Sequence, residues 1–157
     1  MASTYVAMNT AFAATTGAKT VLNLIAGANQ PVQLIEWGVS MDGVTSSAVP
    51  ATVNLCQSTQ ATAGTSGGSI PAIVQEKGRS ITAQMTTGHN YTAEPTALTI
   101  IEQVYVPQFM GVYVRSYLPG DGPDTDLSGG TVKALAIRVN VSANVNVLAY
   151  ARFVIDW

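Results

Sequence analysis

The sequence predicts an all-β protein, specifically an antiparallel β-sandwich of the jelly-roll type with about eight strands. Apolar residues recur with a period of two, as in "PVQLIEWGVSM" (31–41). Short segments rich in β-branched and aromatic residues alternate with turn sequences such as "PGDGPDTDLSGG" (119–130). No segment carries apolar residues at helical spacing between capping residues. The 157 residues suffice for one such domain.

The first segment, residues 1–18, has no charged side chain and no clear period. We therefore expect an extended arm outside the sandwich, with the jelly-roll domain spanning 19–157. Its apolar residues Tyr5, Val6, Met8 and Phe12 favour docking onto a neighbouring subunit, and simple disorder is the alternative. The segment lacks a basic region followed by an unbroken apolar run, so we expect no secretory signal. No stretch of about 18 apolar residues predicts a membrane span.

The predicted strands follow in order along the chain. In 31–41, one face carries mostly apolar residues and is expected to face the core: Gln33, Ile35, Trp37, Val39 and Met41. Further strands are predicted at 19–26, 51–57, 96–106 and 111–118, with weaker ones at 70–75 and 79–85. Residues 134–141 and 145–155 alternate strongly around "SAN" (142–144), which predicts a hairpin between them.

Charged residues are scarce and small polar residues are abundant. Only 10% of the residues are charged, against about 25% in an ordinary soluble chain. Short uncharged side chains lose little rotamer entropy when covered, so the composition suits a protein packed against copies or partners. The net charge of -2 comes without any cluster of Lys or Arg, so we expect no nucleic-acid binding.

One short stretch, "AGTSGG" (63–68), matches the G-x-S-x-G pattern of a hydrolase nucleophile around Ser66. That motif needs a preceding strand and a following helix, and no helix is predicted here. The lone histidine, His89, lies in a predicted turn, "TTGHN" (86–90), and Glu76 is the acid left to orient it in the catalytic order. We therefore predict a loop at Ser66 and no enzymatic activity.

Two further candidates concern thiol and metal chemistry. The single cysteine, Cys56, excludes an internal disulfide and lies in a predicted strand, where a plain buried thiol is expected. Asp121, Asp124 and Asp126 have the spacing D-x-x-D-x-D, which matches no calcium loop. We expect an exposed acidic turn, with cation binding as the alternative, and no cofactor.

Aromatic residues supply the remaining candidates. Trp37 lies on the apolar face of its strand and is expected in the core, whereas Trp157 fits either core or surface. Tyr113 and Tyr117 share the face opposite Val112 and Val114, and with Arg115 they form a semi-polar stripe suited to an intersubunit contact. The predicted interface residues are Tyr5, Val6, Phe12, Tyr113, Arg115 and Tyr117.

The order of segments also carries a resemblance. "NQPVQLIEWGVSMDGVTSSAVPATVNLCQSTQATAGTSGG" (29–68), "VYVPQFMGVYVRSYLPG" (104–120) and "GTVKALAIRVNVSANVNVLAYARFVID" (130–156) resemble jelly-roll capsid decoration, or cement, proteins encoded among the head genes of tailed bacteriophages. The similarity runs from about 20 to 155, and "EWGVSMDG" (36–43) is its most characteristic part. The N-terminal arm departs from it.

The resemblance implies a non-enzymatic virion protein, made in the host cytoplasm and located on the outer capsid surface. It implies a homotrimer at threefold positions that bridges major capsid subunits against the pressure of packaged DNA. Two alternatives remain open. One is a carbohydrate- or receptor-binding jelly-roll module, such as a tail-fibre tip, and the other is an esterase built on Ser66.

Overall fold

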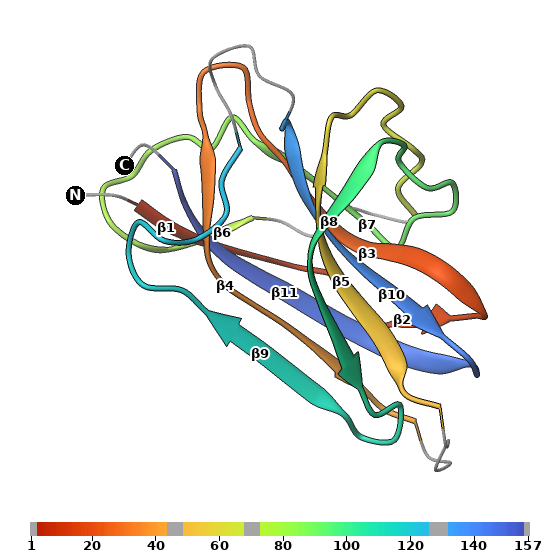
Figure 1. Ribbon diagram of the computed structural model, residues 1–157. Helices are drawn as coiled ribbons and strands as arrows, with labels where there is room; N and C mark the ends of the chain where they lie inside the picture. Colours follow the sequence, from red (N-terminus) through yellow and green to blue (C-terminus); the bar gives the residue numbers. More distant parts are fainter. Residues whose placement is uncertain (1–2, 44–48, 68–72, 126–131, 156–157) are drawn as a thin grey trace.

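Two antiparallel sheets packed face to face form the molecule (Figure 1). The computed structural model describes residues 3–43, 49–67, 73–125 and 132–155. Eleven strands and no helix lie within these residues, which confirms the all-β sandwich. The strands are β1 Ser3–Met8, β2 Phe12–Ala14, β3 Gly17–Ile25, β4 Val32–Met41, β5 Ala51–Ser58, β6 Val74–Lys77, β7 Thr86–His89, β8 Leu98–Val106, β9 Val112–Ser116, β10 Ala134–Val141 and β11 Val145–Ile155.

Eight of these strands are wound as a jelly roll, as the sequence predicts. The six-stranded sheet has the order β6-β1-β11-β4-β9, with β2 also paired to β11, and the five-stranded sheet has the order β7-β3-β10-β5-β8. Eight strands remain when the short strands β2, β6 and β7 are left out. They pair from the two ends of the chain inward: β1 with β11, β3 with β10, β4 with β9 and β5 with β8. This nested antiparallel pairing is the jelly-roll winding.

The core lies between the two sheets and follows the period-two pattern. In β11 every second residue from Val145 to Ile155 is buried, and Phe153 is the largest of these side chains. Trp37 of β4 is fully buried, which confirms the prediction for this residue. Because alternate residues of a strand point to opposite faces, the same pattern leaves the remaining side chains of β11 on the outer face of the sheet.

The prediction of an N-terminal arm outside the sandwich is wrong for the part of residues 1–18 that the structure describes. Residues 3–8 form β1, which pairs with β11 and β6, and residues 12–14 form β2, which also pairs with β11. Tyr5 is only 3% exposed and stacks on Phe153 with ring centroids 5.9 Å apart. The pattern was hard to detect because the small residues Ser3 and Ala7 occupy the other buried positions. The sandwich therefore includes residues that the sequence assigned to the arm.

The predicted hairpin between 134–141 and 145–155 is also wrong. β10 lies in the five-stranded sheet between β3 and β5, and β11 lies in the six-stranded sheet between β1 and β4. The short connection at 142–144 therefore crosses from one sheet to the other. Alternation shows which side chains face the core, but it does not show which strand is the hydrogen-bonded neighbour.

A β-bulge changes the predicted core face of β4. Arg152 of β11 is opposite Glu36, but the next residue, Phe153, is opposite Leu34, so Ile35 is the extra residue. On the N-terminal side of the bulge, Val32 and Leu34 join the core instead of the predicted Gln33 and Ile35. A single uninterrupted alternation cannot represent a strand with an extra residue.

The segment from 70 to 90 also differs in detail. β6 covers part of the predicted strand 70–75, but no strand forms over 79–85. The predicted turn "TTGHN" contains β7, which pairs with β3 and buries His89. The segment is composed of residues that are common in turns, so its sequence predicts a turn and not this short strand.

Candidate interaction surface

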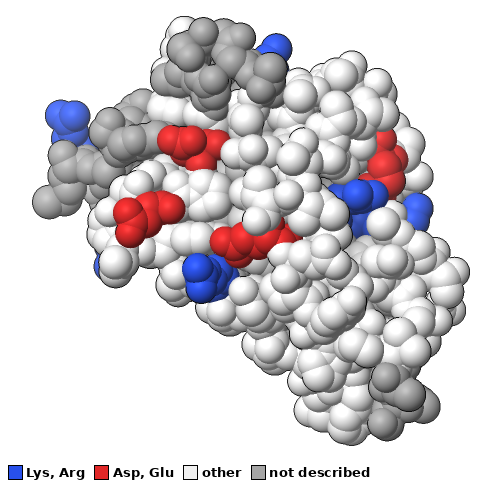
Figure 2. All heavy atoms as spheres, viewed as in Figure 1, with Lys and Arg blue, Asp and Glu red and all other residues white. Residues whose placement is uncertain are grey.

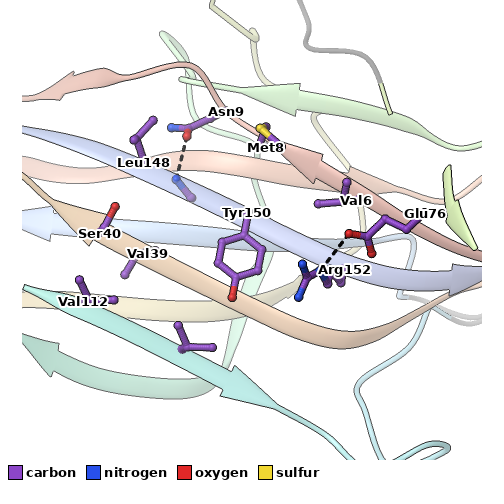
Figure 3. A pocket seen from close by; sticks show the side chains of 12 residues that line it. Val6, Met8, Asn9, Val39, Ser40, Glu76, Val112, Leu148, Tyr150 and Arg152 are labelled. Atoms are coloured by element: carbon purple, nitrogen blue, oxygen red, sulfur yellow. Dashed lines mark hydrogen bonds and ion pairs between the residues drawn. The ribbon is translucent and has the colours of Figure 1, made fainter. Parts of the chain in front are cut away.

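An exposed apolar area covers the outside of the six-stranded sheet. It is formed by side chains of three strands, and we call it the apolar outer face: Val6 and Met8 of β1, Val112 and Val114 of β9, and Leu148 and Tyr150 of β11. Val112 is 69% exposed, Leu148 50% and Met8 48%. Together with their neighbours these residues line a shallow hollow of about 520 Å³ (Figure 3). Contiguous exposed apolar side chains of this kind are often found at binding surfaces.

Strand alternation and one glycine shape this hollow. Leu148 and Tyr150 alternate with the buried residues of β11, so both side chains point outward. Beneath Tyr150, a Cβ atom at Gly38 of β4 would lie 2.6 Å from the Cε1 atom of the tyrosine ring. Glycine at this position therefore allows the ring to lie close against the sheet.

One end of the apolar outer face carries a group of charges. The Arg152 guanidinium contacts two carboxylates, Glu36 at 2.8 Å and Glu76 at 3.2 Å. The hydroxyl of Tyr150 donates to Glu36 at 2.8 Å, and the hydroxyl of Ser116 donates to its second oxygen at 2.9 Å. Figure 3 shows Arg152 between Tyr150 and Glu76. These groups form hydrogen bonds and ion pairs with one another, and the apolar outer face ends where they begin.

The pKa values in this group indicate fixed charges. The hydrogen bond from Tyr150 has the largest effect in lowering the pKa of Glu36, Ser116 and Arg152 act in the same direction, and burial opposes them. Burial and then the neighbouring Glu36 raise the pKa of Tyr150 to about 12. At neutral pH the carboxylate is therefore ionised and the phenol is neutral, and the hydrogen bond between them holds the two side chains together.

The interface residues predicted in the first segment lie in different environments. Tyr5 belongs to the core, where its hydroxyl donates to the carbonyl of Ile81 at 2.6 Å. Phe12 is half-buried and packs against the core from β2. Val6 is half-buried and lines the hollow. Of these three, Val6 is the one that reaches the apolar outer face.

The predicted stripe on β9 lies mostly on the inner side of the strand. Tyr113 packs against Trp37 with ring centroids 5.2 Å apart. The indole N–H of Trp37 donates to the Tyr117 hydroxyl at 3.1 Å, which donates to Glu102 at 2.7 Å. Arg115 is exposed, lies over the Tyr117 ring at 5.5 Å, and approaches Glu102 at 4.0 Å. These residues connect the edges of the two sheets.

Sequence reasoning did not select the most exposed residues of the surface. The sequence places Val112 and Val114 on the face opposite Tyr113 and predicts the tyrosine face as the contact. Met8 is one of the apolar residues of the first segment that favour docking, but it is not among the predicted interface residues, and Leu148 is not singled out at all. A signal was present, because β9 and β11 carry apolar residues on both faces, and a strand exposed on one side does not need them.

The structure brings Ser66 close to His89, but through the main chain of the histidine. The Ser66 hydroxyl donates to the His89 carbonyl at 3.0 Å and accepts from the His89 N–H at 3.0 Å. Glu76, the expected orienting acid, contacts Arg152 near the other sheet. The serine hydroxyl therefore holds a loop onto β7, which is the loop role predicted for it.

That loop belongs to the cover of the five-stranded sheet. Thr65 pairs with Ala93, and Gly64, with φ of +72°, approaches the Ala93 carbonyl closely. Segments 62–67 and 90–97 together lie over the outside of the sheet, and we call this surface the covered face. Its contacts are polar, since Glu94 accepts from the Thr20 hydroxyl at 2.6 Å and lies 3.6 Å from Arg138.

The thiol and metal candidates have these positions. Cys56 is a free buried thiol in β5, as predicted, and burial raises its pKa to about 11. Asp121 and Asp124 are exposed, and Asp126, like Trp157, lies outside the described residues. Within the described part of the chain, no three His, Cys, Asp or Glu side chains come together as a metal site.

Charges are sparse over the surface drawn in Figure 2. Lys, Arg, Asp and Glu gather in the upper part of this view, and the lower part, where β9 begins in Figure 1, shows uncharged residues. Among the described residues, no helix is long and apolar enough to cross a membrane. Comparison with protein-family models, with curated proteins and with solved structures finds no match to this chain.

Proposed function

We propose that this protein is a non-enzymatic virion structural protein that forms homotrimers on the outer surface of an icosahedral phage capsid. It stabilises the shell by bridging neighbouring major capsid subunits. The observation that carries the proposal is the apolar outer face, because an isolated monomer leaves Val112, Val114 and Leu148 in water. The low charge content and the jelly-roll winding support it, as does the sequence resemblance to decoration proteins.

The proposed mechanism is thermodynamic. A protein that binds the assembled shell, and not its dissociated subunits, stabilises the shell by mass action. Each copy contributes a modest free energy, and symmetric attachment at several points adds these contributions. No covalent step is needed for this mechanism.

The alternative, a carbohydrate- or receptor-binding module, has less support. Such a module needs an aromatic ring free to stack on a sugar. Tyr150 is the aromatic residue in the hollow, but its ring lies close to Gly38 and has the guanidinium of Arg152 above it at 5.9 Å. Tyr105 and Phe109 are exposed, but neither lines this hollow. Trp37 is buried. Specific binding to a glycan array would favour this alternative.

The test combines native mass spectrometry with co-sedimentation. The purified protein is mixed with empty shells of the capsid protein encoded in the same genome, with an excess of an unrelated protein as control. We expect a mass of three copies in solution, saturable binding to the shells, and a higher melting temperature of the decorated shells. A protein that remains in the supernatant and leaves shell stability unchanged would contradict the proposal.

A further inference from the structure

The edge strand β9 has main-chain groups directed away from its own sheet. Among the described strands, β9 pairs with β4 alone. The Met41 N–H donates to the Gly111 carbonyl and the Tyr117 N–H donates to the Ile35 carbonyl, each at 2.9 Å. In an antiparallel ladder the hydrogen-bonded positions alternate, so odd-numbered residues bond to β4. The N–H and C=O groups of Val112, Val114 and Ser116 therefore point outward.

This edge is short and carries the charge of Arg115, but it lacks other features that usually prevent strand pairing. Its register with β4 is regular over all five residues, and it contains no proline and no lysine. The corresponding edge strand of the other sheet, β8, is different, because Ile101 forms a bulge between the pairs of Leu55 and Cys56. Thus β9 is the straighter template for another strand.

We propose that β9 pairs antiparallel with β9 of a second copy, about a twofold axis at Val114. In this register Val114 lies opposite the partner's Val114, and Val112 lies opposite the partner's Ser116. These are the residues whose main-chain groups point outward, so each pair forms two hydrogen bonds. The two six-stranded sheets then become continuous, and their apolar outer faces join.

Side-chain chemistry selects this register. Tyr113 lies opposite the partner's Arg115, a pair suited to a cation–π contact, and no two like charges meet. Beyond the strand ends, Met110 and Leu118, exposed by 71% and 72%, lie opposite each other across the axis. If the register between the two strands shifts by two residues in one direction, Arg115 lies opposite the partner's Arg115. If it shifts by two residues in the other direction, Ser116 has no partner in the ladder.

The inference does not depend on the proposed capsid role. A twofold strand contact is distinct from the threefold contact of a trimer, so one can fail while the other holds. If both exist, the strand contact joins one trimer to the next, because neighbouring threefold units of a closed shell are related by twofold axes.

Disulfide trapping with V114C tests the pairing, with V112C as the matched control. Hydrogen-bonded partners in an antiparallel ladder have Cα atoms about 5.5 Å apart, which fits a disulfide. The two copies of position 112 would lie four residues apart along the ladder, about 13 Å, which is too far. The native Cys56 is buried and does not compete.

We expect V114C to form a covalent dimer under mild oxidation, faster by an order of magnitude or more than V112C. Position 112 is the more exposed, so random collisions would favour the control. Equal rates for the two variants, or a V114C protein that stays uncrosslinked, would overturn the inference.

A second pair of variants tests the main-chain bonds. V114P removes an N–H that points away from β4, a position where an edge strand tolerates proline. We expect it to abolish concentration-dependent dimerisation in sedimentation velocity while the urea midpoint stays close to that of the wild type. V114T keeps the N–H and should dimerise. Dimers that persist in V114P would overturn self-pairing. If the outward amides of β9 are protected from hydrogen exchange only when shells are added, self-pairing is also overturned, and β9 pairs with a strand of the capsid protein instead.

Discussion

The two outer faces of the sandwich differ in what lies on them. The covered face of the five-stranded sheet is closed by segments 62–67 and 90–97 of the same chain, with Glu94 and Tyr91 bonded to the sheet. The apolar outer face of the six-stranded sheet has no such cover among the described residues, and Leu148 and Val112 remain exposed. A face closed by its own chain contributes to folding, whereas an open apolar face is available to a partner.

The largest effect is expected on the covered face. Tyr91 is buried there, and the Asn23 amide donates to its hydroxyl at 3.0 Å. Y91A removes a buried ring and leaves that amide without its acceptor, so we expect a loss of about 3–5 kcal/mol in the free energy of unfolding. Urea denaturation measures it.

The matched control is Y105A, because Tyr105 on β8 is 72% exposed. It should change stability by less than about 0.5 kcal/mol. Equal effects of the two variants would show that the cover is not docked on the sheet, and the contrast between the faces would disappear.

The apolar outer face should show the opposite behaviour. L148D places a charge where the proposed partner packs, so shell binding should fall at least about tenfold, or about 1.4 kcal/mol. Stability should change by less than about 1 kcal/mol because the side chain is exposed. Quantitative co-sedimentation and urea denaturation measure the two effects.

The control for this variant is I100D on the five-stranded sheet, where Ile100 is similarly exposed. It should bind shells like the wild type. If L148D also binds normally, the apolar outer face is not the docking surface.

The smallest effect concerns the charged end of the apolar outer face. The pKa of Glu36 is lowered below its ordinary value of 4.5, mainly by the Tyr150 hydroxyl. A lowered carboxylate pKa adds stability that is present above the ordinary value and lost as the pH falls through the folded-state value. E36Q should therefore be less stable than the wild type at neutral pH, by under about 1 kcal/mol because the ion pair is partly exposed.

This difference should shrink in acid. Urea denaturation of both proteins at neutral pH and below about pH 4 measures it. A difference that stays constant across this range would show that the carboxylate charge is not its source.

The sequence predicted the fold class because alternation is a local property. The runs 134–141 and 145–155, which form β10 and β11, carried it, and their alternate residues do face the core. The hairpin error arose because alternation contains no information on pairing partners. The arm error arose because Ser3 and Ala7 fill buried positions without an apolar signal. The bulge at Ile35 exchanges the inward-facing and outward-facing positions of β4 on its N-terminal side, and a single alternating pattern cannot show this exchange.

The candidate surface was only partly predictable. The low charge content indicated association, and Val6 was selected. Which valines of β9 face outward depends on the direction in which that strand packs, and Tyr113 was taken for the exposed side although it packs on Trp37. Exposure is a property of the assembled sandwich, so Leu148 is found only after the strands are placed, and Met8 is separated from the buried Tyr5 only then.

The most direct test uses two native methionines of opposite exposure. Met8 lies on the apolar outer face and is exposed, whereas Met85 is buried. Their rates of oxidation by dilute peroxide, followed by peptide mass spectrometry, are compared in free and shell-bound protein. We predict that Met8 oxidises rapidly in the free protein and is strongly protected on the shell, with Met85 slow in both. An unchanged rate at Met8 in shell-bound protein would contradict the claim that the apolar outer face is the interaction surface.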